Sequence, residues 1–86
     1  MFVIITYDIE AKRVSKVMKI CRKYLKHVQR SVFEGMLTEA KLEKLKWELK
    51  RTVDTQVDSI YIYRIESMKY TSKEIIGSDE QMDSII

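Results

Sequence analysis

The chain has 86 residues, 45% of them hydrophobic, no proline and a net charge of +3, which suits one small domain with a single core. It has no apolar run of the ~18 residues that cross a bilayer, no secretory leader and only one cysteine, so we expect a cytoplasmic protein without disulfides or a membrane partner. All 16 basic residues lie at or before Lys73, whereas residues 74–86 carry only acidic charge. A basic body favours nucleic acid as a partner, and a solvated charged surface is the alternative.

Hydrophobic patterning predicts alternating strands and helices in the first half of the chain. The first strand covers residues 2–7 and is apolar on both faces, and a helix over residues 11–26 follows it after a short turn. Residues 27–37 favour either two short strands or one strongly bent strand, in which Gly35 permits a bulge or kink.

The second half of the chain repeats the pattern of a helix followed by a strand. Thr38 suits the N-cap of a helix over residues 39–51, whose leucines share one face while Trp47 points away from them. The last strand of the core spans residues 57–65, and residues 73–76 form a further short strand before the second glycine. We therefore expect one core domain and a short C-terminal addition.

This order predicts an α+β fold of the ferredoxin-like βαββαβ type, an antiparallel sheet with two helices on one face. The other face would carry Tyr61 and Tyr63, opposite a core row of Ile60 and Ile62. Since a contiguous apolar surface usually marks an interface, we predict a two-fold homodimer through this face. Stacking of the two tyrosines on RNA bases is the alternative.

Asp8 is the main candidate for chemistry because it ends an otherwise apolar strand. A carboxylate there costs free energy unless it is paired, hydrogen-bonded or metal-bound. In a two-fold dimer, two Asp8 side chains could share one Mg²⁺ or Mn²⁺ ion that binds a phosphodiester and activates a water. The alternative is that Asp8 caps the helix that begins two or three residues later.

A wholly basic segment follows Asp8, with eight Lys or Arg residues and no acidic residue between Ala11 and Arg30. Lysines on one helix face repel one another by a few tenths of a kcal/mol per pair. A bound polyanion would relieve this repulsion, and a solvated stripe is the alternative. The expected stripe consists of Lys12, Lys16, Lys19, Lys23 and Lys26, and we predict phosphate contacts from its first four members together with Arg13 and Arg30.

Two motifs resemble the Cas2 family of small CRISPR-associated proteins, which are partners of the CRISPR integrase. Tyr7-Asp8-Ile9 is similar to the opening motif of that family, and residues 28–35 are similar to its second, more specific motif. The resemblance covers most of the chain. It implies a ferredoxin-like homodimer in which two Asp8 side chains face each other, with metal-dependent cleavage of single-stranded RNA or double-stranded DNA.

The same resemblance implies roles for further residues. Tyr7 joins Asp8 as a catalytic candidate, and Ser31 and Phe33 are candidate substrate contacts. In the family the C-terminal segment adds a strand to the neighbouring subunit and contacts the integrase, which places Ile75 and Ile76 at an interface. We accordingly divide the chain into a core domain, residues 1–66, and a C-terminal extension, residues 67–86.

Three functions remain open at this point. The first is a CRISPR adaptation subunit that binds nucleic acid with the integrase and cleaves it with paired Asp8 and Mg²⁺. The second is an architectural DNA-binding dimer without catalysis. The third is a toxin-like ribonuclease of the VapD-related group, which shares the expected fold.

Overall fold

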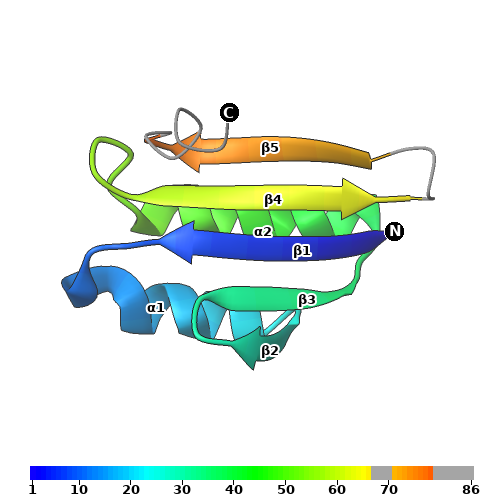
Figure 1. The fold of residues 1–86 in the computed structure, drawn as a ribbon, viewed down its shortest axis with the longest axis horizontal. Helices are drawn as coiled ribbons and strands as arrows, with labels where there is room; N and C mark the ends of the chain where they lie inside the picture. Colours follow the sequence, from blue (N-terminus) through cyan, green and yellow to red (C-terminus); the bar gives the residue numbers. More distant parts are fainter. Residues whose placement is uncertain (67–70, 79–86) are drawn as a thin grey trace.

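A computed structural model describes residues 1–66 and 71–78. The strands form a single antiparallel sheet in the order β2-β3-β1-β4-β5, so that β1 lies at its centre. Both helices pack on one face of this sheet (Figure 1), which confirms the predicted α+β, ferredoxin-like arrangement. The elements are β1 (Phe2–Asp8), α1 (Ala11–Arg22), β2 (Lys26–Gln29), β3 (Val32–Met36), α2 (Glu39–Thr52), β4 (Ser59–Ile65) and β5 (Thr71–Gly77).

The two faces of the sheet differ because successive side chains of a strand point to opposite sides. In β1, Val3 and Ile5 are fully buried under the helices. Phe2 and Ile4 lie on the other face, where they are only half-buried, and Asp8 ends the same row as an exposed residue. The helices therefore cover one face of the sheet and leave the other, the bare face, without a helix, as the sequence predicts, although Tyr61 on the bare face is itself only 4% exposed.

The core lies between the sheet and the two helices. The fully buried apolar side chains come from β1, β3, β4 and both helices, so these five elements share one core. Burial also raises the pKa of the Cys21 thiol to about 12. The fully buried apolar side chains are Val3, Ile5, Val17, Cys21, Phe33, Leu42, Leu45, Leu49, Ile60 and Ile62.

The second helix begins where the sequence predicts and the first ends earlier than expected. The Thr38 hydroxyl accepts a hydrogen bond of 3.2 Å from the Lys41 N–H, which confirms the predicted N-cap. The prediction that α1 continues to residue 26 was wrong, because α1 ends at Arg22 and Lys26 already pairs with Glu34 in the β2–β3 ladder. Pairing in the sheet outweighs helix propensity here.

Residues 27–37 form two strands rather than one bent strand. The register shift lies in β2, between His27 and Gln29, and not at Gly35. A Cβ at Gly35 would lie 3.2 Å from the Leu25 side chain, so glycine serves close packing at that position. The connecting turn places Arg30 at a φ of 22°.

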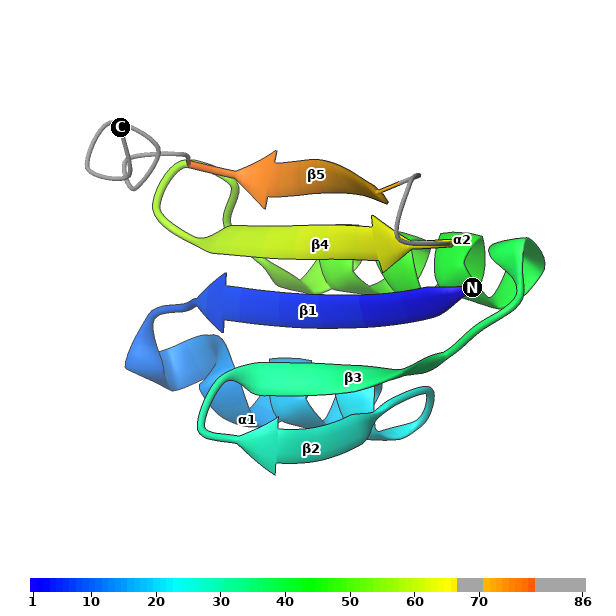
Figure 2. The ribbon, with the colours of Figure 1, turned by 45° about the vertical axis from the view of Figure 1, so that its right-hand side comes forward.

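The predicted C-terminal strand is present as β5, which pairs antiparallel with β4 of the same chain (Figures 1 and 2). Ile76 is 5% exposed and joins the core, whereas Ile75 lies opposite Tyr61 and is half-buried. Glu74 accepts a hydrogen bond of 2.9 Å from the buried Lys46 of α2, which fastens β5 to the helix layer. The rest of the predicted extension, 67–70 and 79–86, lies outside the described residues.

Within the described part of the chain, neither helix is long and apolar enough to cross a membrane.

Candidate functional site

A cavity of about 420 Å³ opens at the carboxyl end of β1. It brings together four residues that the sequence singled out: Tyr7 and Asp8 from β1, and Arg30 and Ser31 from the β2–β3 turn. The Tyr7 N–H donates a hydrogen bond of 3.2 Å to the Ser31 carbonyl, which joins the strand to the turn. The remaining lining residues are Ile9, Val14, Met18 and His27.

The Asp8 carboxylate at this cavity is exposed and has no hydrogen bond or ion pair with the described residues. The interpretation of Asp8 as a helix cap was wrong, because Glu10 is the N-cap residue of α1 and no side chain of the described residues bonds there. The backbone of Asp8 pairs with Ser59 of β4, which fixes its position at the end of the central strand. Both carboxylate oxygens are therefore free to bind a ligand.

Tyr7 lines the same cavity as Asp8. Its hydroxyl is buried and has no hydrogen-bond partner among the described residues, although buried hydroxyls normally find one. Burial is the main cause that raises the pKa of Tyr7. The phenol therefore stays protonated at neutral pH, and because its hydroxyl has no exposed surface it can donate to a ligand only after the side chain moves.

Two rings support the turn beside the cavity. Phe33 is fully buried and stacks on His27, with ring centroids 4.4 Å apart. His27 Nε2 contacts the Arg30 carbonyl across the turn. His27 thus lies on an edge strand and also lines the cavity. Phe33 does not line the cavity and supports it indirectly, by packing against His27.

Asp58 is the residue that the sequence analysis missed. It is fully buried, and its carboxylate accepts hydrogen bonds from Arg13 Nε at 2.5 Å and Nη2 at 3.0 Å. It also accepts the backbone N–H groups of Glu10 and Asp54, both at 2.9 Å. The Arg13 hydrogen bonds, followed by those backbone donors, hold the pKa of Asp58 at about 2. The only sequence signal was a carboxylate at a strand end, the same signal that singled out Asp8.

The ion pair with Asp58 bears on the phosphate contact that the sequence predicts for Arg13. Only 15% of its side chain is exposed, because the guanidinium is held by Asp58 and lies 3.5 Å from Glu10. The predicted phosphate contact would have to compete with that bidentate ion pair. Arg13 therefore joins the β1–α1 turn to the start of β4.

The lysine stripe is shorter than predicted, and its members differ in whether they lie on α1 and whether they are ion-paired. Lys23 forms an ion pair with Glu48, and the Tyr24 hydroxyl donates to the same carboxylate. Lys26 lies on β2, off the helix. The members that remain exposed on α1 itself are Lys12, Lys16 and Lys19.

No group of three or more His, Cys, Asp or Glu side chains that could hold a metal ion is found among the described residues. Mg²⁺ is usually bound through one or two carboxylates, with water and substrate phosphates completing its shell. The Asp8 carboxylate, which has no partner among the described residues, could serve as one of these carboxylate ligands. A second carboxylate would have to come from a second copy of the chain.

Comparison with known proteins gives a consistent result. The family model described as CRISPR associated protein Cas2 matches residues 1–73. A Thermotoga maritima protein named CRISPR-associated endoribonuclease Cas2 is 46% identical over 86 residues, covering 100% of this chain and 99% of the relative. A Methanocaldococcus jannaschii protein of the same name is 40% identical over 87 residues, covering 100% of this chain and 76% of the relative.

Solved structures agree with the sequence matches. A crystal structure of a Cas2 protein superposes with a TM-score of 0.75 at 39% identity, covering 93% of this chain and 90% of the other. Streptococcus pyogenes Cas2 at pH 6.5 gives a TM-score of 0.70 at 37% identity, covering 76% of this chain and 86% of the other. By both sequence and fold, the chain belongs to the CRISPR-associated Cas2 family.

Proposed function

We propose that this chain is a metal-dependent endonuclease subunit of CRISPR spacer acquisition, which acts as a two-fold homodimer and binds RNA or DNA with an integrase partner. The observation that carries the proposal is the cavity lined by Asp8, whose carboxylate has no partner among the described residues, together with Tyr7 and Arg30. The relatives named endoribonucleases support the reaction class. Family membership favours this role over that of a VapD-related toxin.

The bare face of the sheet supports the homodimer. Phe2 and Ile4 of β1 lie on it beside Tyr63, which pairs with Ile4 across the β1–β4 ladder. Asp8 belongs to the same row of β1. A two-fold axis that packs the bare faces together would therefore bring Asp8 toward Asp8 of the partner subunit.

The residues of the cavity have distinct roles in this proposal. A divalent ion, Mg²⁺ or Mn²⁺, held by Asp8 of both subunits would polarise the phosphodiester and activate a water. Tyr7 would donate a hydrogen bond to a non-bridging phosphate oxygen once its side chain turned the buried hydroxyl toward the cavity. The Arg30 guanidinium would hold a neighbouring phosphate, and Ser31 would orient it through its hydroxyl.

Surfaces outside the cavity would hold the rest of the substrate and the partner protein. The exposed Lys12, Lys16 and Lys19 favour phosphate contacts that carry no sequence preference. Lys23 and Arg13 are held in closer ion pairs than Lys12, whose ammonium lies 3.9 Å from Glu10, and they would contribute less. The integrase would engage the C-terminal segment next to β5.

Replacing Asp8 with alanine is expected to reduce cleavage by on the order of 100-fold or more, because it removes the metal ligand. The assay compares labelled single-stranded RNA and double-stranded DNA with Mg²⁺, Mn²⁺ or a chelator. Asp54→Asn is the matched control, since this exposed carboxylate accepts only the Gln56 N–H, which an amide oxygen can also accept. Equal cleavage by wild type and Asp8→Ala would refute the catalytic role and leave an architectural nucleic-acid-binding dimer.

Replacing Tyr7 with phenylalanine separates catalysis from stability. We expect slower cleavage, because the proposed hydrogen-bond donor to the phosphate is lost. The free energy of unfolding should be unchanged or higher by up to about 1 kcal/mol, because a buried hydroxyl without a partner is removed. Cleavage rates and urea denaturation measure the two effects. A variant that is destabilised but cleaves normally would contradict this role for the hydroxyl.

A further inference from the structure

Trp47, the only tryptophan of the chain, lies on the outer side of α2 with 59% of its surface exposed. The opposite side of α2 carries Leu42, Leu45 and Leu49, which are fully buried. An indole is among the largest apolar surfaces that a side chain can bury. An exposed indole contributes little to the stability of the fold, and the cavity that Trp47 lines shares no residue with the Asp8 cavity.

Trp47 is one wall of a shallow cavity between the helices. The Arg51 guanidinium carbon lies 4.4 Å from the centroid of the Trp47 ring, in a cation–π contact. Ile20 of α1 lines the opposite side, and the cavity has a volume of about 220 Å³. The indole and the guanidinium together form a flat, partly apolar platform at the mouth of this cavity.

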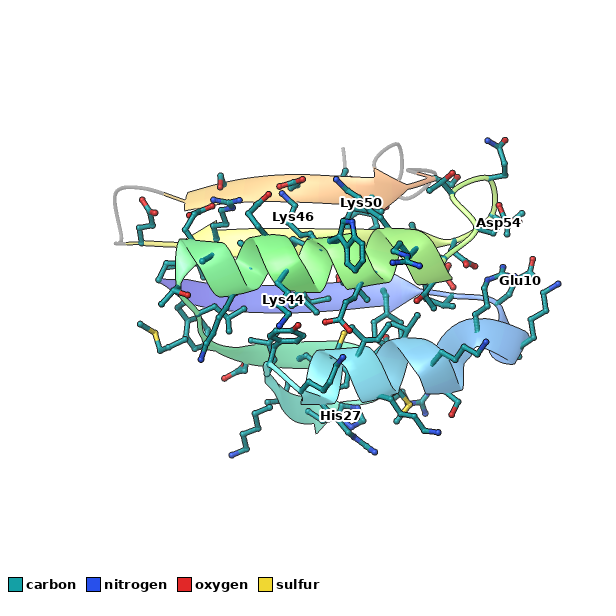
Figure 3. The ribbon with its side chains drawn as sticks, turned by 180° about the vertical axis from the view of Figure 1, so that it is seen from behind. Glu10, His27, Lys44, Lys46, Lys50 and Asp54 are labelled. Carbon is teal, nitrogen blue, oxygen red and sulfur yellow. The ribbon has the colours of Figure 1, made fainter. Side chains whose placement is uncertain are left out.

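The charge around this platform is positive. Of the residues that line the cavity, Glu48 is the only acid, and it already binds Lys23 and Tyr24. Lys44 and Lys50 lie three residues before and after Trp47, and Figure 3 shows them along opposite edges of α2, seen from the side away from the sheet. Neither lysine has an ion pair within the described residues, and the same holds for Arg51.

We propose that Trp47 and Arg51 form a stacking site for an unpaired nucleotide of single-stranded DNA or RNA. Bases stack on indole and guanidinium planes whatever their sequence, and exposed lysines attract the flanking phosphates. A duplex keeps its bases covered by stacking, so the site favours a single strand over a duplex. The site lies on the helix layer and does not depend on cleavage at Asp8.

Intrinsic fluorescence tests the proposal directly, because the single tryptophan reports on this site alone. The full chain is titrated in chelator with a short oligothymidine or oligouridine strand, and with an abasic strand of equal length and charge. We expect the strands with bases to quench Trp47 and the abasic strand to leave its emission nearly unchanged. Comparing deoxyribose with ribose shows which strand the site prefers.

Matched variants give the size of the effect. Affinity measured with a labelled strand should fall by about 5- to 150-fold in Trp47→Ala, and by less in Trp47→Phe, which keeps an aromatic ring. Lys41→Ala removes an exposed cation of α2 outside the cavity and should weaken binding only slightly. Quenching should persist in Asp8→Ala, so that loss of cleavage and loss of stacking are separate results.

Two outcomes would overturn the stacking site. One is unchanged strand affinity in Trp47→Ala, which would leave the patch as a surface for a partner protein. The other is equal quenching by the abasic strand, which would mean that phosphates alone bind near the indole.

Discussion

Replacing Asp58 with alanine is expected to lower the free energy of unfolding by about 3–5 kcal/mol, the usual effect of removing one partner of a buried ion pair. The change leaves the Arg13 guanidinium, only 15% exposed, without its buried bidentate partner, so that only the more exposed Glu10 carboxylate at 3.5 Å remains. It also leaves the N–H groups of Glu10 and Asp54 without their acceptor. Urea denaturation followed by circular dichroism measures the loss.

The neighbouring Asp54 supplies the control for this experiment. Its carboxylate is exposed and, among the described residues, accepts only the Gln56 N–H, at 3.0 Å. Asp54→Ala should therefore cost about 1 kcal/mol or less. If the Asp58 variant lost no more than this control, the network would not hold the turns together as described.

The pH dependence of stability should carry the signature of Asp58. Its pKa in the folded protein is about 2, below the ordinary value of 3.8, so the unfolded chain binds the proton more readily. The stabilisation is fully present above about pH 4 and is lost as the pH falls toward about 2. In Asp58→Asn the stability curve should be flatter over this range than in the wild type.

Replacing Ile60 with aspartate is expected to prevent folding, because an unpaired charge would enter the core at a fully buried position. A buried charge without a partner costs several kcal/mol, which is comparable to the whole stability of a small domain. Circular dichroism and the solubility of the expressed chain report the result. A folded Ile60→Asp variant would contradict the assignment of β4 to the centre of the core.

Ile4→Asp is the matched change on the other face of the same sheet. Ile4 is half-buried on the bare face, so its replacement should leave the fold of the chain intact. If the bare faces pack together in a homodimer, this variant should be monomeric by light scattering, whereas the wild type is dimeric. A dimeric Ile4→Asp variant, or a monomeric wild type, would contradict the proposed interface.

Most of the fold could be predicted because its pattern is local. The alternation in β1, the leucine face of α2 and the Thr38 cap each follow from residues close together in the sequence. The end of α1 could not be predicted in the same way. Residues 23–26 are compatible with a helix, and only the pairing of Lys26 with Glu34 in β3 decides otherwise.

The candidate site was predictable in part for the same reason. Tyr7 and Asp8 are adjacent, and Arg30 and Ser31 belong to one turn, so each pair could be identified from a short motif. The partner of Arg13 could not, because Asp58 lies 45 residues away and becomes its neighbour only through the order of the strands. A long-range ion pair of this kind leaves no periodic pattern in the sequence.

The buried Cys21 has a practical consequence for measuring the assembly. Thiol reagents attack the thiolate, and with a pKa of about 12 and no exposed surface this sulfur is inert at neutral pH. A new cysteine at Met36, which is 70% exposed at the end of β3, would then take a spin label alone, without removing the native thiol. Two such labels in an assembly with a two-fold axis would yield a single distance by electron paramagnetic resonance, and half of that distance would be the separation of the label at position 36 from the axis.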